Sequence, residues 1–276
     1  MVQDVTINGI TYPDVEAVDY VDKNGVKHSL DKLMLNNTVA WRKPVPLPEK
    51  DTLENMSWED ISTVCKAGKA AEYWSVGDQK TINVKEYNSK HGYYVDEEYS
   101  VELIGFDHDV VSDPAEYGRE MAGATFQLRN LLATQYHEYY QESWKKFNIR
   151  TSFLADVYNN RLSDVPKKCI VSVQKQSYSK SKESVTTTDK LFLLSEYEID
   201  GALTYSYAPE GKQYKYYSTI GRKIKKIGGD NDAAGDWYTR SLLSDDSYHC
   251  YVVRFDTSGK IQVGNAKAYI SFAFCV

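Results

Sequence analysis

The chain has 276 residues, of which 42% are hydrophobic and 26% charged, and its formal net charge is −6. This composition is that of a globular protein with room for one large domain and a smaller appendage, and it argues against wholesale disorder. The negative charge argues against a nucleic-acid binder, because such affinity comes mainly from clustered Lys and Arg. No apolar run reaches about 18 residues and no secretory leader opens the chain, so we expect no membrane insertion.

Tyrosine is the unusual part of the composition, with 23 Tyr against 8 Phe and 5 Trp. Tyrosine covers area at a low entropy cost and keeps a hydroxyl for hydrogen bonds, which suits a recognition surface. A β-rich fold with tyrosines on exposed strand faces accounts for the same composition. Both interpretations stay open at this point.

Residues 1–42 look like a separate region. Asn8-Gly9 and Asn24-Gly25 each stand between short runs of β-forming residues, and Asn-Gly favours the type I′ turn of a hairpin. Two hairpins of this size are marginally stable alone, so we expect them to need a partner. Residues 43–56 form a Pro-rich linker, since three prolines force extended backbone. The large domain is predicted over 57–276.

The first part of the large domain mixes helix and strand. Ser57 with Asp60 three residues later predicts a capped helix, and a strand is expected to follow Gly77. "SVELIGFDHDVV" is predicted as β, "AGATFQLRNLL" as either a strand or a short helix. "ESWKKFNIRTSFLADVYNNRL" has its large apolar side chains at helical spacing and is predicted as a helix.

The second part is predicted to be mostly β. "KCIVSVQKQSY" alternates as a strand does, "KSKESVTTT" is predicted as a mobile polar loop, and "DKLFLLSEYEIDG" as a buried strand that enters a turn or helix. "CYVVRF" and "KIQVGN" flank a hairpin turn at Gly259, and "AYISFAFCV" is a last hydrophobic strand. The fold class predicted is α+β with long loops.

Four cysteines carry no metal-ligand spacing, and without a disulfide framework we expect buried thiols. Cys250 and Cys275 lie on neighbouring predicted strands and are the pair to consider for a bridge.

Candidate catalytic and metal chemistry is sparse. In "GFDHDVVSD", Asp107 and Asp109 could converge on a cation while His108 faces away, because neighbours in a strand point to opposite faces. A structural role for these carboxylates is favoured over a metal site. No nucleophile elbow, phosphate loop or dinucleotide fingerprint is present. We therefore predict no cofactor and no enzyme, and keep a carbohydrate-active or oxidising enzyme as the third hypothesis.

Several segments, in order, resemble an uncharacterised domain family common in tailed-phage and prophage genes. They are "SWEDISTVCKAGKAAEYWSVGDQKTINV", "IGFDHD", "AGATFQLRNLL", "TTTDKLFLLSEYEIDG" and "EGKQYKYY". Trp144, the Trp237-to-Ser241 element and Phe274-Cys275 continue the pattern. Glu142-Ser143 and Trp237-Tyr238-Thr239-Arg240 depart from the Gly-Gly and Trp-Trp-Leu-Arg of that pattern. The start "VTINGITYPDVEAVD" is similar to the leader of phage tail and fibre proteins.

The resemblance implies a C-type-lectin-like domain, similar to formylglycine-generating-enzyme-like scaffolds, in which side chains hold long loops. We expect the following scaffold residues: Trp237, Arg240, Trp58, Trp74 and Trp144. The loop-rich stretch near 245 is the hypothetical recognition face, because binding residues concentrate on loops. Its candidate ligand-binding residues are Tyr238, Asp245, Asp246, Tyr248 and His249.

The sequence therefore predicts a phage virion protein, made in the host cytoplasm and placed on the tail or head surface. Its N-terminal region would attach to other virion proteins, and its lectin-like domain would adhere to host cell-surface polysaccharide. A homo-oligomer is expected, as is usual for virion appendages. The alternative is a head or tail decoration protein that binds only other virion subunits.

Overall fold

The computed structural model describes residues 3–7, 10–15, 17–30, 32–35, 38–42, 45–88, 92–138, 141–228, 233–243, 252–264 and 267–276. Helices and antiparallel sheets are mixed along the chain, so the fold class is α+β, as predicted. No helix within these residues has the length and apolar character needed to cross a bilayer.

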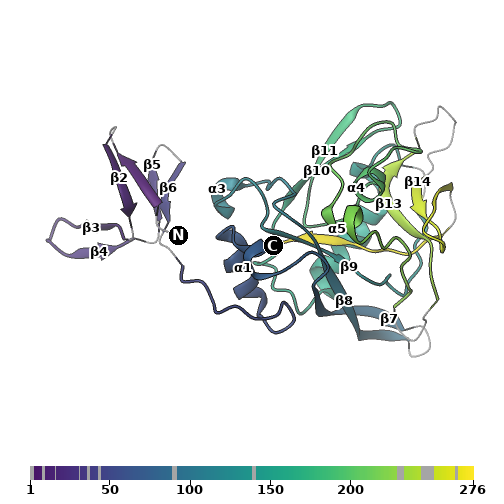
Figure 1. Ribbon diagram of the computed structural model, residues 1–276, viewed down its shortest axis with the longest axis horizontal. Helices are drawn as coiled ribbons and strands as arrows, with labels where there is room; N and C mark the ends of the chain where they lie inside the picture. The colour runs from purple at the N-terminus through teal and green to yellow at the C-terminus, as the bar shows by residue number, and fades with distance from the viewer. Residues whose placement is uncertain are drawn as a thin grey trace.

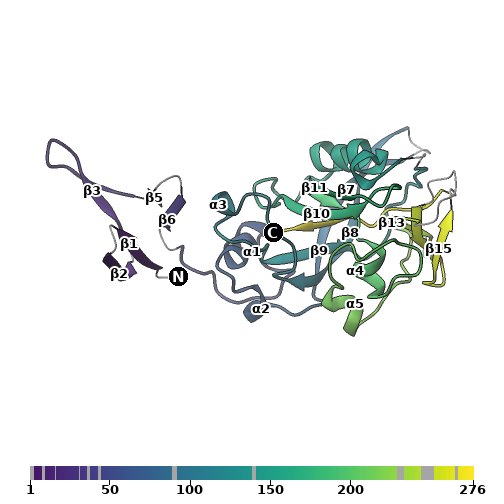
Figure 2. The same cartoon turned by 90° about the horizontal axis from the view of Figure 1, so that it is seen from above.

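The N-terminal region consists of three hairpins. They are β1 (Gln3–Ile7) with β2 (Ile10–Val15), β3 (Asp19–Val21) with β4 (Lys27–Ser29), and β5 (Lys32–Leu35) with β6 (Thr38–Arg42). They lie together at one end of the molecule in Figures 1 and 2. Gly25 takes a φ of 81°, which supports the predicted turn there. The third hairpin was not predicted, because no Asn-Gly pair stands between its strands.

The predicted linker is extended only in part. Tyr73 donates a hydrogen bond to the Pro48 carbonyl (2.6 Å), and Leu53 and Met56 are buried in the core. Helix α1 (Trp58–Lys66) then begins at Ser57, whose hydroxyl accepts from the Asp60 amide, and the short α2 (Ala70–Tyr73) follows.

A five-stranded antiparallel sheet forms the centre of the large domain, in the order β12-β16-β9-β8-β7. The strands are β7 (Gln79–Asn88), β8 (Tyr93–Phe106), β9 (Ala124–Leu128), β12 (Leu191–Phe192) and β16 (Ala273–Cys275). The last segment of the chain thus lies between strands from much earlier in the sequence (Figure 1). "AGATFQLRNLL" contributes strand β9, not a helix.

Alternation along β9 sends side chains to both faces of the sheet. On one face Phe126 stacks with Phe274 at 5.6 Å between ring centroids, and Trp58 of α1 meets Phe126 edge-on at 5.3 Å. On the other face Gln127 accepts a hydrogen bond from Tyr217 (2.6 Å), which belongs to α5 (Lys215–Thr219). The sheet is therefore covered on both sides.

The remaining elements surround this sheet (Figure 2). They are α3 (Pro114–Tyr117), a 3₁₀ turn η1 (Trp144–Lys146), two π-helical segments η2 (Ile149–Leu154) and η3 (Val157–Arg161), α4 (Glu196–Asp200), the hairpin β10 (Val173–Tyr178) with β11 (Ser184–Asp189), and a sheet of β13 (Trp237–Leu242), β14 (Val252–Phe255) and β15 (Ile261–Gly264).

Two local predictions differ from the structure. "KSKESVTTT" was expected to be a mobile loop, but residues 184–189 pair with β10 as β11. Thr and Val favour strands, so a polar β-branched run can pair without an apolar face of its own. The predicted helix after Glu142 is helical, but with 3₁₀ and π hydrogen bonding.

Candidate functional site

A buried salt bridge joins β13 to α4. Arg240 donates to both carboxylate oxygens of Glu198, at 2.5 and 3.0 Å. Its other N–H groups donate to the carbonyl oxygens of Gln176, Leu193 and Glu210. These contacts use all five guanidinium donors. Arg240 thus ties together chain segments that share no regular hydrogen bonding.

Lys175 continues this buried network toward the central sheet. Its ammonium donates to Asp109 (2.5 Å), Glu198 (3.0 Å) and the Tyr214 hydroxyl (3.1 Å). Burial opposes ionisation of Asp109, but the attraction of Lys175 outweighs it, so the pKa of this carboxyl lies well below its usual range. Burial likewise opposes the charge of Lys175, and the two carboxylates raise its pKa nonetheless. The charges of the network therefore compensate one another.

Glu210 is the member of this region that titrates near neutrality. Its carboxyl is buried, accepts from the Tyr178 amide (2.8 Å) and is bonded to the Ser241 hydroxyl. Burial raises its pKa to about 7, although the nearby Arg240 acts in the opposite direction. The network thus contains one carboxyl whose charge depends on pH in the physiological range.

The predicted metal candidates do not come together. β8 ends at Phe106, and Asp107 takes a left-handed φ of 47° that directs it to Arg119 (2.9 Å), while Asp109 enters the core. Ligand atoms of His108, Asp109 and Glu198 do lie within 4.8 Å of one another. The Lys175 ammonium binds both carboxylates of that group. A cation is thus already supplied by the protein, which favours a structural role.

The structure places all five expected scaffold residues in the core. Trp237 donates to the Lys223 carbonyl (2.9 Å), Trp74 to the Asp51 carbonyl (3.3 Å) and Trp144 to the Asp189 carboxylate (3.0 Å). Trp58 packs on the sheet as described above, and Arg240 centres the salt-bridge network. Trp237, Trp74, Trp144 and Arg240 thus hold loops or strand ends through polar contacts, whereas Trp58 contacts the sheet through the rings of Phe126 and Phe274.

The predicted recognition face requires a correction at Tyr238. This side chain is 1% exposed, and its hydroxyl donates to the Tyr136 carbonyl and accepts from the Glu138 amide. Strand β13 is buried on both faces, so alternation exposes no residue there. The other candidates, Asp245, Asp246, Tyr248 and His249, lie outside the described residues, as does Cys250; Cys65, Cys169 and Cys275 are buried free thiols.

A solvent-accessible hollow of about 320 Å³ opens where the β7–β8 hairpin meets η3. We call it the tyrosine pocket; its lining residues are Lys85, Tyr94, Asp156, Asn160 and Arg161. The π-helical turn explains why three of them converge. A π-helix repeats close to every four to five residues, so positions i, i+4 and i+5 share a face, and such segments are frequent at functional sites.

Asp156 organises the polar wall of the tyrosine pocket. One carboxylate oxygen accepts from the side-chain amide of Asn160 (2.7 Å), and the other accepts from Arg161 Nε (2.6 Å). The Arg161 guanidinium lies over the rings of Tyr94 (5.2 Å) and Phe153 (5.1 Å). The wall is therefore fixed before any ligand arrives.

Aromatic side chains extend the tyrosine pocket onto the surface. Tyr94 is 51% exposed and meets Tyr87, itself 52% exposed, edge-on at 5.5 Å. An exposed ring beside fixed amide, carboxylate and guanidinium groups suits a ligand with an apolar face and hydroxyl groups. No local sequence pattern indicates this site, because Tyr94 and Asp156 lie far apart along the chain; the Tyr-rich composition is only a general signal.

Comparison with known proteins yields one family. Its sequence model, described as Domain of unknown function (DUF6273), matches residues 122–275, more than half of the chain. The match includes the π-helical wall of the tyrosine pocket and the Lys175, Glu198 and Arg240 network. Nothing among curated proteins or solved structures matches the chain.

Proposed function

Since this chain belongs to the DUF6273 family of domains of unknown function, we propose its function from the tyrosine pocket. The protein is a recognition module that binds a bacterial cell-surface polysaccharide. The large domain is the binding part, with a C-type-lectin-like scaffold. The chain acts as a phage virion protein on the tail or head surface.

The observation that carries this proposal is the exposed Tyr94 ring beside the polar wall built by Asp156. Sugar rings present C–H groups on one face and hydroxyl groups around the edge. The aromatic face of Tyr94 provides area for the former, and Asn160, Lys85 and Arg161 provide hydrogen-bonding groups for the latter. The preordered wall lowers the entropy cost of binding.

Buried carboxylates that hold loops support a binding role through rigidity. Glu196 is an example: its carboxylate accepts from the amides of Thr204, Tyr205 and Ser206 and so fixes the loop after α4. Long loops held in this way can present a surface of constant shape. The N-terminal hairpins would provide attachment to neighbouring virion subunits and would gain stability from a homo-oligomeric arrangement.

The test is binding of the full chain to an array of purified bacterial surface polysaccharides and to intact bacterial cells. We expect saturable binding that Tyr94→Ala weakens about tenfold or more. Tyr207→Ala is the matched control, because Tyr207 is 50% exposed and does not line the tyrosine pocket. Binding that both variants retain would reject the tyrosine pocket as the site.

Failure of the chain to bind any polysaccharide or cell would reject the recognition function. If virions that lack the protein then captured the full chain, the decoration role would be the correct one.

A further inference from the structure

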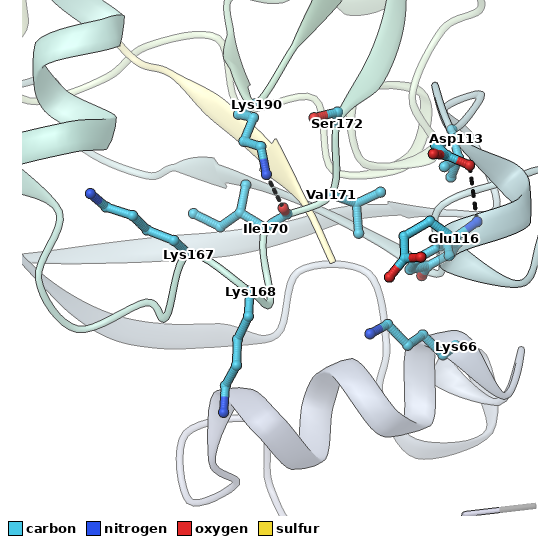
Figure 3. Close-up of a pocket in the computed structure, with 11 residues that line it drawn as sticks. Lys66, Asp113, Glu116, Lys167, Lys168, Ile170, Val171, Ser172 and Lys190 are labelled. Carbon is cyan, nitrogen blue, oxygen red and sulfur yellow. Dashed lines mark hydrogen bonds between the residues drawn. The ribbon is translucent and has the colours of Figure 1, made fainter. Parts of the chain in front are cut away.

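A second hollow, of about 210 Å³, lies between the end of α1, the start of α3 and the segment before β10 (Figure 3). Four lysines surround it: Lys66, Lys167, Lys168 and Lys190. We call it the lysine pocket. Its apolar lining includes Ile170 and Val171, and Asp113 and Glu116 lie on the side formed by α3.

The lysine charges are only partly compensated. Lys168 pairs with Glu59 at 3.2 Å. Within the described ranges, no carboxylate lies at ion-pair distance from Lys66, Lys167 or Lys190. The whole chain has a net charge of −6, so the lysine pocket reverses the sign of the protein locally. Four lysines against the two carboxylates of Asp113 and Glu116 leave an excess of positive charge in this concave surface, and such an excess concentrates anions.

Two of the ammonium groups are already held in place. Lys190 donates to the Ile170 carbonyl (3.1 Å), and Lys167 donates to the Asn159 carbonyl (2.9 Å). Both ammonium groups lie over the ring of Tyr158, at 5.4 and 5.5 Å from its centroid. Ordering such long side chains usually costs binding free energy. Figure 3 shows the Lys167 ammonium directed away from Lys66, whereas Lys190 is held on Ile170, which lines the pocket. The ordering of Lys190 therefore lowers the cost of binding in the pocket.

The acidic side of the lysine pocket has a structural use. Asp113 caps α3 by accepting from the Glu116 amide at 2.9 Å. The same segment is joined to the opposite wall, because the Ser112 amide donates to the Ser172 carbonyl at 2.9 Å. The walls are therefore connected by backbone bonds, and the pocket keeps its shape without a ligand.

We propose that the lysine pocket binds a phosphate group. An ammonium group acts on phosphate as a point charge with three donors and needs no planar geometry. Ile170 and Val171 beneath the site displace water and strengthen the attraction. This site is separate from the tyrosine pocket and does not depend on the function proposed for it. Free phosphate and the phosphodiester of a polyol-phosphate polymer are the two sources of such a group.

The experiment is a titration of the full chain with inorganic phosphate, glycerol 3-phosphate and poly(glycerol phosphate), followed by amide NMR shifts. If the phosphate group alone is recognised, we expect saturable shifts at Ser172 and Lys190 with all three ligands. Saturation with the polymer but not with inorganic phosphate would support the pocket and identify the polymer as the source. Shifts absent with all three would overturn the proposal.

The double variant Lys66→Gln/Lys190→Gln should weaken binding about tenfold and reduce its salt dependence. Lys215→Gln is the matched control, because Lys215 is exposed on α5 and remote from the lysine pocket in sequence. Equal weakening by this control would mean non-specific attraction and overturn the proposal.

Glu116→Gln provides a second test that does not remove a lysine. Loss of this exposed negative charge at the rim should tighten phosphate binding about two- to fivefold. A charge-based site would be contradicted if Glu116→Gln left the phosphate affinity unchanged and the double variant did not weaken it. Tyr94→Ala should leave the phosphate titration unchanged.

Discussion

Arg240 and Glu198 form a two-pronged salt bridge inside the protein, with side-chain exposures of 1% and 2%. Because the guanidinium also holds the carbonyl oxygens of three separate segments, its loss would leave a buried charge and several unsatisfied acceptors.

Arg240→Met should therefore destabilise the protein by about 3–5 kcal/mol. Urea denaturation followed by circular dichroism measures this change. Arg222→Met serves as the control, since Arg222 is 44% exposed and lies 3.7 Å from Glu102; its cost should be below about 1 kcal/mol. A similar small cost for Arg240→Met would show that the network contributes little.

Glu210 should make stability fall as the pH rises. Burial raises its pKa from the ordinary 4.5 to about 7, so between these values the folded state binds more protons than the unfolded state. The stabilising contribution is full below about pH 4.5 and is lost as the pH passes 7. Glu210→Gln should remove this pH dependence. Between pH 4.5 and 8, the stability of this variant relative to the wild type should therefore rise by roughly 3 kcal/mol.

Thermal melts of both proteins across this pH range measure the effect. Glu183→Gln, an exposed position, should track the wild type throughout. A constant difference between Glu210→Gln and the wild type would show that Glu210 does not titrate in this window.

Lys225 should act in the opposite direction at higher pH. It is buried, with its ammonium on the Leu128 carbonyl (2.5 Å), and burial lowers its pKa from 10.5 to about 7. Between those values the unfolded state binds more protons, so stability rises with pH. The burial cost is full below about pH 7 and relieved above it.

Lys225→Met removes the titrating group, and its thioether replaces the ammonium over the Trp237 ring with a sulfur–aromatic contact. The wild type should gain stability relative to this variant from pH 7 to pH 9.5, as measured by chemical denaturation. Lys215→Met should show no such trend, because its side chain is exposed. Parallel curves for wild type and Lys225→Met would contradict the lowered pKa.

Asp156→Asn should weaken polysaccharide binding without unfolding the domain. The substitution removes the charge that holds Arg161 (2.6 Å) over Tyr94, so the polar wall loses its order. We expect about five- to tenfold weaker binding on the polysaccharide array and a stability loss below about 1 kcal/mol. Glu142→Gln breaks an exposed pair with Lys146 and should leave binding intact; unchanged binding by Asp156→Asn would argue against the wall.

Local features of the fold were predictable where the signal is contained in a few residues. Ser57 with Asp60 predicted the start of α1, and Gly259, with a φ of 77°, predicted the turn between β14 and β15. β11 was missed because its threonines resemble a polar loop. The π geometry after Asn148 was missed because helical spacing of apolar residues does not distinguish hydrogen-bond types.

The candidate site was less predictable, for a physical reason. Asp109, Lys175 and Glu198 are brought together by the packing of strands and helices that are distant in sequence. No local sequence pattern indicates that these three side chains lie in contact. Arg240 was selected through a resemblance, and Tyr238 was misplaced because an aromatic in a polar stretch looks like surface when both faces of its strand are in fact covered.

The place of β16 between β12 and β9 has a consequence for how the protein folds. The central sheet cannot be completed until β16, more than a hundred residues beyond β9, has been synthesised. Until then one edge of β9 has no strand to pair with. Contacts of such large sequence separation slow folding and expose strand edges in the interval. During synthesis this chain should therefore depend on chaperones more than an α+β domain whose strands pair in sequence order.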